Sequence, residues 1–211
     1  MLAIRAERAI VRVMDNLDLL LALGAFALVA SITPGPNNLM LMASGANFGL
    51  RRTLPHILGV ALGFVAMVVL VGLGAMRAFE AWPMLRVLLT WLGAAYLVWL
   101  AWKIARAAPP EPGAAPGRPM TFLQAAAFQW VNPKGWTMAL AALTLYAPGQ
   151  KPSAVLLVAG AFAAASVPAT GLWTILGTRI RRLLSRPARL RLFNRAMALL
   201  LLASLVPVFL P

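Results

Sequence analysis

The sequence predicts an all-α integral membrane protein in which six transmembrane helices form a 3+3 inverted repeat with broken first and fourth helices. Three observations support this fold class. Of the 211 residues, 62% are hydrophobic and 11% charged, and the mean hydropathy is +0.83, whereas soluble domains average about a quarter charged residues. Six apolar stretches are long enough to cross about 30 Å of hydrocarbon. Two of these stretches are interrupted by polar clusters that contain proline.

The predicted spans take up almost the whole chain, so no separate soluble catalytic or regulatory domain fits beside them. We therefore treat residues 1–211 as a single membrane domain. The predicted spans, in chain order, are Leu17–Met42, Thr53–Met76, Met84–Ala105, Met120–Tyr146, Pro152–Thr178 and Leu190–Leu210.

A segment rich in proline, glycine and alanine, residues 107–119, divides the spans into two sets of three. This composition does not support a helix and predicts an exposed linker between a first half, 17–106, and a second half, 120–211. Because each half contains an odd number of spans, the second half enters the membrane in the opposite orientation. If the halves are homologous, they form an inverted repeat, which is typical of secondary transporters.

The net charge of +14 is better explained by membrane orientation than by nucleic-acid binding. Lys and Arg gather in cytoplasmic loops of membrane proteins, and here most of them follow the first, third and fifth predicted spans. The loops on the other side carry only Arg77, Arg86 and Lys151. This bias predicts that both termini lie on the outer face. No basic cluster is interleaved with aromatic residues, so we expect no nucleic-acid partner.

The segment before the first span leaves two interpretations open. If translation begins at Met1, Arg5, Arg8 and Arg12 would lie on the outer face, in a short basic amphipathic helix on the membrane surface. Alternatively, translation begins at Met14 and this segment is not made. A signal peptide is not supported, because no small-residue cleavage site separates the segment from the first span.

The first interruption lies in the first span, where Pro34, Gly35 and Pro36 precede Asn37 and Asn38. Proline removes a backbone hydrogen bond and stops a helix. The helix that resumes presents unpaired N–H groups and the positive end of its dipole inside the membrane. That end suits an anion such as a substrate carboxylate. The alternative is a proline kink whose amide side chains satisfy the freed backbone groups locally.

The second interruption lies in the fourth span and adds a positive charge, Lys134, after Asn132 and Pro133. A cation near the middle of a membrane helix costs roughly 2.5–3.5 kcal/mol on insertion scales. None of the five acidic residues lies deep in a span. We therefore expect Lys134 to face a water-filled cavity, backbone carbonyls or a bound anionic group. Snorkelling to the membrane interface is the alternative.

The two interruptions predict one substrate site, because an inverted repeat brings its broken helices together near mid-membrane. Helix N-termini and the lysine suit a carboxylate, while unwound carbonyls and Asn side chains suit an ammonium group. The expected partner is therefore a small zwitterionic amino acid, and the lack of a buried acid disfavours strongly cationic substrates. The candidate substrate-binding residues are Pro34, Gly35, Pro36, Asn37, Asn38, Gln129, Asn132, Pro133 and Lys134.

Other features predict packing rather than chemistry. Gly45 and Gly49, like Gly59 and Gly63, have the GxxxG spacing of closely packed membrane helices. His56 is a lone histidine that we place near a span boundary. The chain has no cysteine, no Ser-His-Asp set, no HExxH motif, no phosphate-binding glycine loop and no paired carboxylates. We therefore predict no enzymatic activity, no metal site and no cofactor.

Three runs of sequence resemble the LysE/RhtB amino-acid exporters. They are the run from Pro34 to Leu39 with the following Gly49-Leu50-Arg51-Arg52 and Gly59, the run from Gly93 to Lys103, and the run from Phe128 to Lys134. The matches cover most of the chain in the expected order and are most similar to the cysteine/O-acetylserine exporter branch. The resemblance implies efflux of small amino acids or their derivatives across the bacterial inner membrane.

The predicted function is that of a secondary transporter, which exports small neutral amino acids or their derivatives by alternating access between two rocking halves. Two other classes stay open. A passive channel would let substrate leak along its gradient, and a non-transporting scaffold would use its GxxxG faces to bind partner helices. The expected surroundings are the lipid bilayer, and the sequence leaves open whether the chain forms a homo-oligomer.

Overall fold

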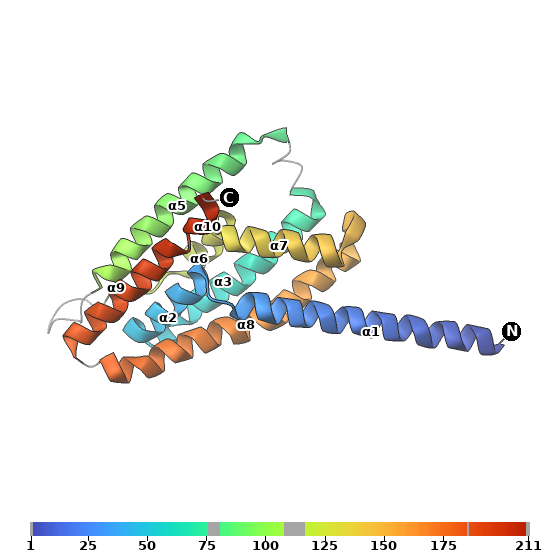
Figure 1. The fold of residues 1–211 in the computed structure, drawn as a ribbon, viewed down its shortest axis with the longest axis horizontal. Coiled ribbons are helices and arrows are strands. Elements are labelled where there is room, and N and C mark those ends of the chain that lie inside the picture. The colour runs from blue at the N-terminus through green and yellow to red at the C-terminus, as the bar shows by residue number, and fades with distance from the viewer. Residues whose placement is uncertain (1, 76–80, 108–116, 185, 210–211) are drawn as a thin grey trace.

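A computed structural model describes residues 2–75, 81–107, 117–184 and 186–209, and within these ranges the chain is helical and contains no strand (Figure 1). Four short π- or 3-10 segments, Val71–Ala75, Gln129–Val131, Pro148–Gln150 and Arg182–Leu184, extend or join the helices. The α-helices are α1 (Leu2–Ile32), α2 (Pro36–Phe48), α3 (Leu50–Leu70), α5 (Met84–Ala105), α6 (Phe122–Phe128), α7 (Pro133–Tyr146), α8 (Pro152–Arg181), α9 (Pro187–Ala203) and α10 (Val206–Phe209).

Three of the described helical segments are long and apolar enough to cross a membrane: Leu50–Ala75, Val87–Ala105 and Pro152–Leu184. They confirm the second, third and fifth predicted spans. The first predicted span corresponds to the bent pair Leu17–Ile32 and Pro36–Phe48, whose helices meet at 56°. If this pair is one broken span, the number of spans rises from three to four. The fourth and sixth spans stay predictions, because α6 and α7 have only 7 and 14 residues and α9 has 17.

Both interruptions end helices where the sequence predicts. The first helix stops at Ile32 and resumes as α2 at Pro36. In the second half, α6 stops at Phe128, one 3-10 turn follows, and α7 begins at Pro133. In both cases proline is the first residue of the resumed helix, where its missing N–H breaks no intrahelical bond and its fixed φ angle suits the helix.

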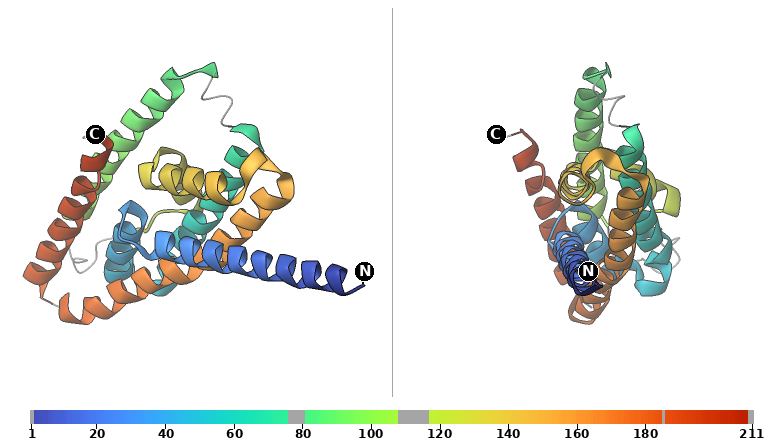
Figure 2. Two further views of the ribbon diagram at one scale, coloured as in Figure 1. Left: turned by 45° about the vertical axis from the view of Figure 1, so that its right-hand side comes forward. Right: turned by 90° about the vertical axis from the view of Figure 1, so that its right-hand side faces the viewer.

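The main core lies where α1, α3, α7 and α8 meet. Phe162 of α8 is fully buried there, with its ring 5.0 Å from that of Phe64 in α3 and 6.3 Å from that of Phe26 in α1. A second cluster joins α5 to α9 through Leu97 and Leu201, and these two helices lie side by side along one flank of the bundle (Figures 1 and 2). Elements from both halves therefore build each core.

Glycines allow two helix pairs to approach until their backbones touch. A Cβ atom at Gly45 or Gly177 would collide with the facing backbone between α2 and α8, and one at Gly59 or Gly63 would collide with the backbone of α6. The packing predicted for Gly45, Gly59 and Gly63 is thus confirmed. Gly49 instead forms the turn between α2 and α3, where its φ angle of 80° favours a residue without a side chain.

The basic loops meet at one end of the bundle. Arg52 Nη2, at the start of α3, donates to the carbonyl oxygen of Gly117 at 2.8 Å, so the end of the linker lies against the α2–α3 turn. The side chain of Arg181, from the end of α8, lies beside Gly49 in the same turn. The turn between α7 and α8 lies at the opposite end, against the π-helical end of α3. Arg77, Met76 and linker residues 108–116 lie outside the described residues.

The segment before the first predicted span continues the first helix. Helix α1 runs without interruption from Leu2 to Ile32, and its N-terminal part projects from the bundle (Figure 1). A separate short helix before the span, one of the two interpretations of this segment, is therefore not what the structure contains. The start of translation at Met14 stays a prediction.

Candidate functional site

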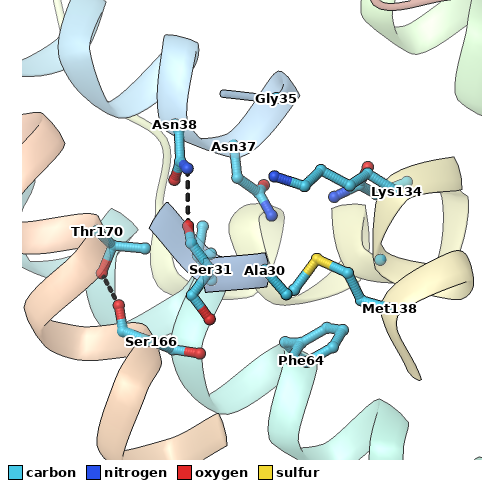
Figure 3. Close-up of a pocket in the computed structure, with 13 residues that line it drawn as sticks. Ala30, Ser31, Gly35, Asn37, Asn38, Phe64, Lys134, Met138, Ser166 and Thr170 are labelled. Carbon is cyan, nitrogen blue, oxygen red and sulfur yellow. Dashed lines mark hydrogen bonds between the residues drawn. The ribbon is translucent and has the colours of Figure 1, made fainter. Parts of the chain in front are cut away.

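The first break frees the last carbonyl groups of α1, and side chains donate hydrogen bonds to several of them. Asn38 Nδ2 donates to the carbonyl oxygens of Ser31 and Thr33, each at 2.8 Å (Figure 3 shows the bond to Ser31). Trp173 Nε1, on α8, donates to the carbonyl oxygen of Ile32 at 2.9 Å. Side chains therefore bond the backbone groups that the break frees, which is the alternative that the sequence left open for this proline kink. Asn38, which is 3% exposed, therefore has a structural role at the break.

Lys134 reaches from α7 to the same set of carbonyl groups. Its Nζ donates to the carbonyl oxygen of Thr33 and, at 3.4 Å, to that of Pro34. Figure 3 shows the side chain extended toward Gly35 and Asn37. The residues that line the surrounding cavity include no Asp or Glu. Of the predicted environments for this lysine, backbone carbonyls are the one observed, and the side chain points into the protein rather than toward an interface.

A pair of amide side chains forms a second connection between the breaks. Asn37 Nδ2 donates to Gln129 Oε1 at 2.8 Å, and Gln129 Nε2 donates back to Asn37 Oδ1 at 3.3 Å. Gln129 Nε2 also donates to the carbonyl oxygen of Ala125 at 2.8 Å. Gln129 is fully buried and lies behind Asn37 rather than on the cavity wall. It therefore orients Asn37 toward the cavity.

The resumed helices α2 and α7 both begin at this place. Neither N-cap residue, Gly35 or Asn132, makes a side-chain capping bond, and each helix has proline at its first position. The first intrahelical bonds run from Leu39 N to the carbonyl oxygen of Gly35 and from Trp136 N to that of Asn132. The N–H groups of the two residues after each proline therefore have no intrahelical acceptor. The positive ends of two helix dipoles meet between the halves.

Two buried oxygen atoms at the same place have no hydrogen-bond donor among the described residues. They are Ser31 Oγ, at the end of α1, and Asn132 Oδ1, at the start of α7. Both residues are largely buried, with 9% and 2% of their surfaces exposed. An unpaired buried oxygen costs about 1–3 kcal/mol. These atoms are therefore ready to accept hydrogen bonds from a bound group.

These groups surround a cavity of about 40 Å³. Ligand pockets typically hold about 300–1,000 Å³, so this cavity is small by comparison. Five of the nine predicted residues line it, and the other four, Gln129 and the three prolines, do not, although Pro34 lends its carbonyl oxygen to Lys134. The lining residues are Ala30, Ser31, Gly35, Asn37, Asn38, Val60, Phe64, Asn132, Lys134, Gly135, Met138, Ser166 and Thr170.

Sequence reasoning missed three polar residues of this wall: Ser31, Ser166 and Thr170 (Figure 3). Thr170 Oγ1 donates to the carbonyl oxygen of Ser166 at 2.6 Å, on α8 beside Pro168. The sequence signal that could have found two of them is the spacing of Ser166 and Thr170, polar residues four positions apart within an apolar span. His56, predicted near a span boundary, lies in the second turn of α3 and is buried, with 1% of its surface exposed.

Both breaks lie within the part of the chain that matches a known protein family. The family described as LysE type translocator matches residues 28–206. This chain belongs to the LysE translocator family. The resemblance inferred from sequence runs is thereby confirmed, and the chain is a multi-pass inner-membrane protein of an amino-acid export family, not an enzyme.

The chain is also similar over most of its length to individual transporters. It is 32% identical over 193 residues to cysteine/O-acetylserine efflux proteins of Escherichia coli K12, Escherichia coli O139:H28 and Shigella sonnei Ss046, and these alignments cover 90% of this chain and 97% of each relative. These relatives place the chain in the cysteine exporter branch of the family. No solved structure matches the chain.

Proposed function

We propose that this chain exports small neutral amino acids or their derivatives by alternating access, and that the cavity between the breaks binds the substrate. One observation carries the proposal. Two uncapped helix N-termini and the Lys134 ammonium group lie around the same cavity as the unpaired oxygens of Ser31 and Asn132. Donors and acceptors of this kind match the two ends of a zwitterion.

The substrate carboxylate would bind the free N–H groups of α2 and α7 together with Lys134. The substrate ammonium group would donate to Ser31 Oγ, Asn132 Oδ1 and the carbonyl oxygens at the end of α1. Lys134 occupies the carbonyls of Thr33 and Pro34 in this conformation. Binding therefore exchanges one ammonium group for another at these carbonyls, while the carboxylate draws Lys134 toward itself.

This exchange favours neutral amino acids over cationic ones. A neutral zwitterion brings one carboxylate to balance Lys134 and one ammonium group to replace it at the carbonyls. A lysine or arginine substrate would add a second cation to a site whose wall contains no carboxylate, and a buried unpaired charge is costly. The relatives named for cysteine and O-acetylserine efflux make those two compounds the first candidates.

The origin of the site residues supports alternating access. Ser31 and Asn37 come from the first half, and Asn132 and Lys134 from the second. A substrate that bridges both sets changes the relative stability of the two arrangements of the halves. The positive-inside bias favours an orientation with the basic end of the bundle in the cytoplasm and the chain termini outside. The exported amino acid would enter from that basic end and leave toward the start of α1.

The two competing classes differ from this proposal in structural terms. A scaffold needs free GxxxG faces, but Gly45, Gly59 and Gly63 already contact other helices of the same chain. A passive channel needs an open path, whereas the cavity is small and the two breaks are joined beside it by Lys134 and by the Asn37–Gln129 pair. An exporter also differs from a channel in that its transport saturates and a second substrate competes.

The test is an export assay in Escherichia coli that overproduces the chain. We expect O-acetylserine and cysteine, but not lysine or arginine, to accumulate in the medium. Replacement of Lys134 by Ala, or of Asn37 by Ala, is expected to abolish export, because each removes a polar side chain from the wall of the proposed substrate site. Lys151→Ala, an exposed lysine in the turn before α8, is the matched control and should export normally.

Immunoblots of washed membranes would establish that each variant inserts at the level of the unmodified chain. Full export by both Lys134→Ala and Asn37→Ala would remove the site assignment. Efflux that rises linearly with the gradient and ignores a competing amino acid would indicate a channel.

A further inference from the structure

A second and larger cavity lies at the basic end of the bundle. Its volume is about 130 Å³, and it follows the C-terminal half of α2, from Met40 to Phe48. Helix α3 and the ends of α5 and the linker complete its wall. None of the residues on that wall took part in the export site described above.

Two cations line this cavity, and none of the described acidic residues pairs with either of them. Lys103, in the last turn of α5, and Arg118, before α6, both belong to the wall, and no Asp or Glu does. The ammonium group of Lys103 lies 4.6 Å from the centre of the Trp99 ring, which also lines the cavity. The described residues include no acidic side chain in position to neutralise either cation. The wall therefore favours an anion.

A buried histidine lies on the same wall. His56 is 1% exposed, and neither ring nitrogen has a hydrogen-bond partner among the described residues. An imidazole always has a nitrogen able to donate or to accept a hydrogen bond, and leaving both unsatisfied in a buried position is costly. An unpartnered polar side chain on the wall of a cavity indicates a ligand that would satisfy it.

Helices α2 and α3 line both the second cavity and the export site. Helix α2 contributes Asn37 and Asn38 to the export site and Met40, one turn later, to the second cavity. Helix α3 contributes His56 to the second cavity and Val60, one turn later, to the export site. The two cavities thus follow one another along the same pair of helices, from the basic end of the bundle toward the breaks.

We propose that this cavity is a second binding site for the transported amino acid, which holds its carboxylate at Lys103 and Arg118 before the substrate moves to the breaks. His56 would bond to the polar part of the ligand, and Trp99 and Tyr96 would cover its apolar part. This inference rests on the export function proposed above. It adds an entry site on the side where the basic loops gather.

The experiment measures how many molecules of radiolabelled O-acetyl-L-serine bind to the purified full chain in detergent, by equilibrium dialysis. We expect two molecules per chain. The double variant Lys103→Gln/Arg118→Gln should bind one, and Lys134→Gln should also bind one. The matched control is Arg106→Gln, because Arg106 lies 4.6 Å from the Trp102 ring as Lys103 does from Trp99, yet it does not line the cavity.

A second variant tests the site without changing surface charge. His56→Leu keeps a buried side chain at this position but removes its polar nitrogens. It should weaken binding of one molecule at least about tenfold, equivalent to about 1.4 kcal/mol. If the unmodified chain binds one molecule, lost in Lys134→Gln and kept in the double variant, the second site is refuted and the export site stands. If the double variant loses a molecule and Lys134→Gln loses none, the second site stands and the export site is wrong.

An anionic lipid headgroup is the other source of negative charge at this end. The same measurement is therefore repeated in phosphatidylcholine nanodiscs with and without phosphatidylglycerol. Persistence of two bound molecules in both membranes supports an amino-acid site. Loss of the second molecule when phosphatidylglycerol is added would overturn the proposal and identify the cavity as a lipid site.

Discussion

At the scale of single residues, the site depends on which side chain donates hydrogen bonds to the carbonyl oxygens at the end of α1. Asn38 is buried and donates to those of Ser31 and Thr33 from within its own half. Lys134 reaches its carbonyls from the other half of the chain and is only partly buried. In the export cycle proposed above, Asn38 maintains the break and Lys134 is the group that the substrate displaces.

Gly35 gives a direct test of the position of Lys134. A Cβ atom at Gly35 would lie 2.6 Å from Lys134 Cδ and 3.2 Å from its Nζ. The backbone there is extended, with φ −177° and ψ 178°, so alanine introduces no backbone strain. We expect Gly35→Ala to shift the flexible lysine away from Thr33 and to lower the export rate about tenfold, or about 1.4 kcal/mol, without lowering the amount of protein in the membrane.

The control is Gly24→Ala in α1, where an added Cβ would meet nothing within 4 Å. Export by this variant should equal that of the unmodified chain. Equal export rates in Gly24→Ala and Gly35→Ala would show that the position of Lys134 does not limit transport.

At the scale of helices, the resumed helix α2 is anchored more closely than α7. Gly45 and Gly177 allow α2 to touch the backbone of α8, and Thr178 Oγ1 donates to the carbonyl oxygen of Gly45 at 3.4 Å. Asn47, near the end of α2, exchanges hydrogen bonds with the buried Asn194 of α9, at 3.0 and 3.3 Å. Without a strong hydrophobic drive between helices in lipid, such backbone contact and polar pairing hold membrane helices together.

This packing predicts a large effect from a small substitution. Gly177→Ala places a methyl group against the Met42 carbonyl, on rigid backbone that cannot turn aside. We expect it to destabilise the fold by about 1–3 kcal/mol, as overpacking usually does. The measurement is the thermal unfolding midpoint of the purified protein in detergent.

A second glycine of α8 provides the comparison. Gly160 has nothing within 4 Å of an added Cβ, and alanine favours a helix by about 0.5–1 kcal/mol over glycine. Gly160→Ala should therefore unfold at the same temperature as the unmodified chain or higher. The packing argument fails if Gly177→Ala and Gly160→Ala unfold at the same temperature.

At the scale of the whole molecule, the proposed orientation rests on the distribution of basic residues between the two ends of the bundle. Turns that carry Arg51 and Arg52, the end of α5 with Lys103, and the end of α8 with Arg181 gather at one end of the bundle. The opposite end, with the α7–α8 turn, carries Lys151. Because the positive-inside rule counts basic residues in short loops, this arrangement supports a cytoplasmic basic end.

The orientation can be measured directly, because the chain contains no cysteine. Single cysteines introduced as Lys151→Cys and Arg106→Cys lie at exposed positions of opposite ends. In intact cells, a membrane-impermeant maleimide is expected to label Lys151→Cys only. Arg106→Cys should become labelled after the inner membrane is permeabilised. Labelling of Arg106→Cys in intact cells would reverse the proposed direction of the bundle.

The amino-acid sequence alone predicts three of the spans, both breaks and the position of Lys134 beside the second break. The breaks depend on local chemistry, since the Pro-Gly-Pro and Asn-Pro clusters end helices, whereas the single prolines Pro55 and Pro168 lie inside continuous helices. Lys134 is conspicuous because a charge within an apolar span is costly. The sequence also distinguishes close packing from chemistry at Gly45, Gly59 and Gly63. It does not separate Asn37 from Asn38, because neighbouring amides on a helix look alike until their partners are known.

The tertiary structure decided those partners. Asn38 turns back to its own half and Asn37 turns to Gln129, which lies in the other half of the chain. His56 is buried on a cavity wall that it shares with the end of the linker and α5, and the sequence did not reveal that burial. Such contacts depend on how distant segments pack, and no local pattern encodes them. The sequence by itself determined where the helices break, and only the fold decided which groups meet there.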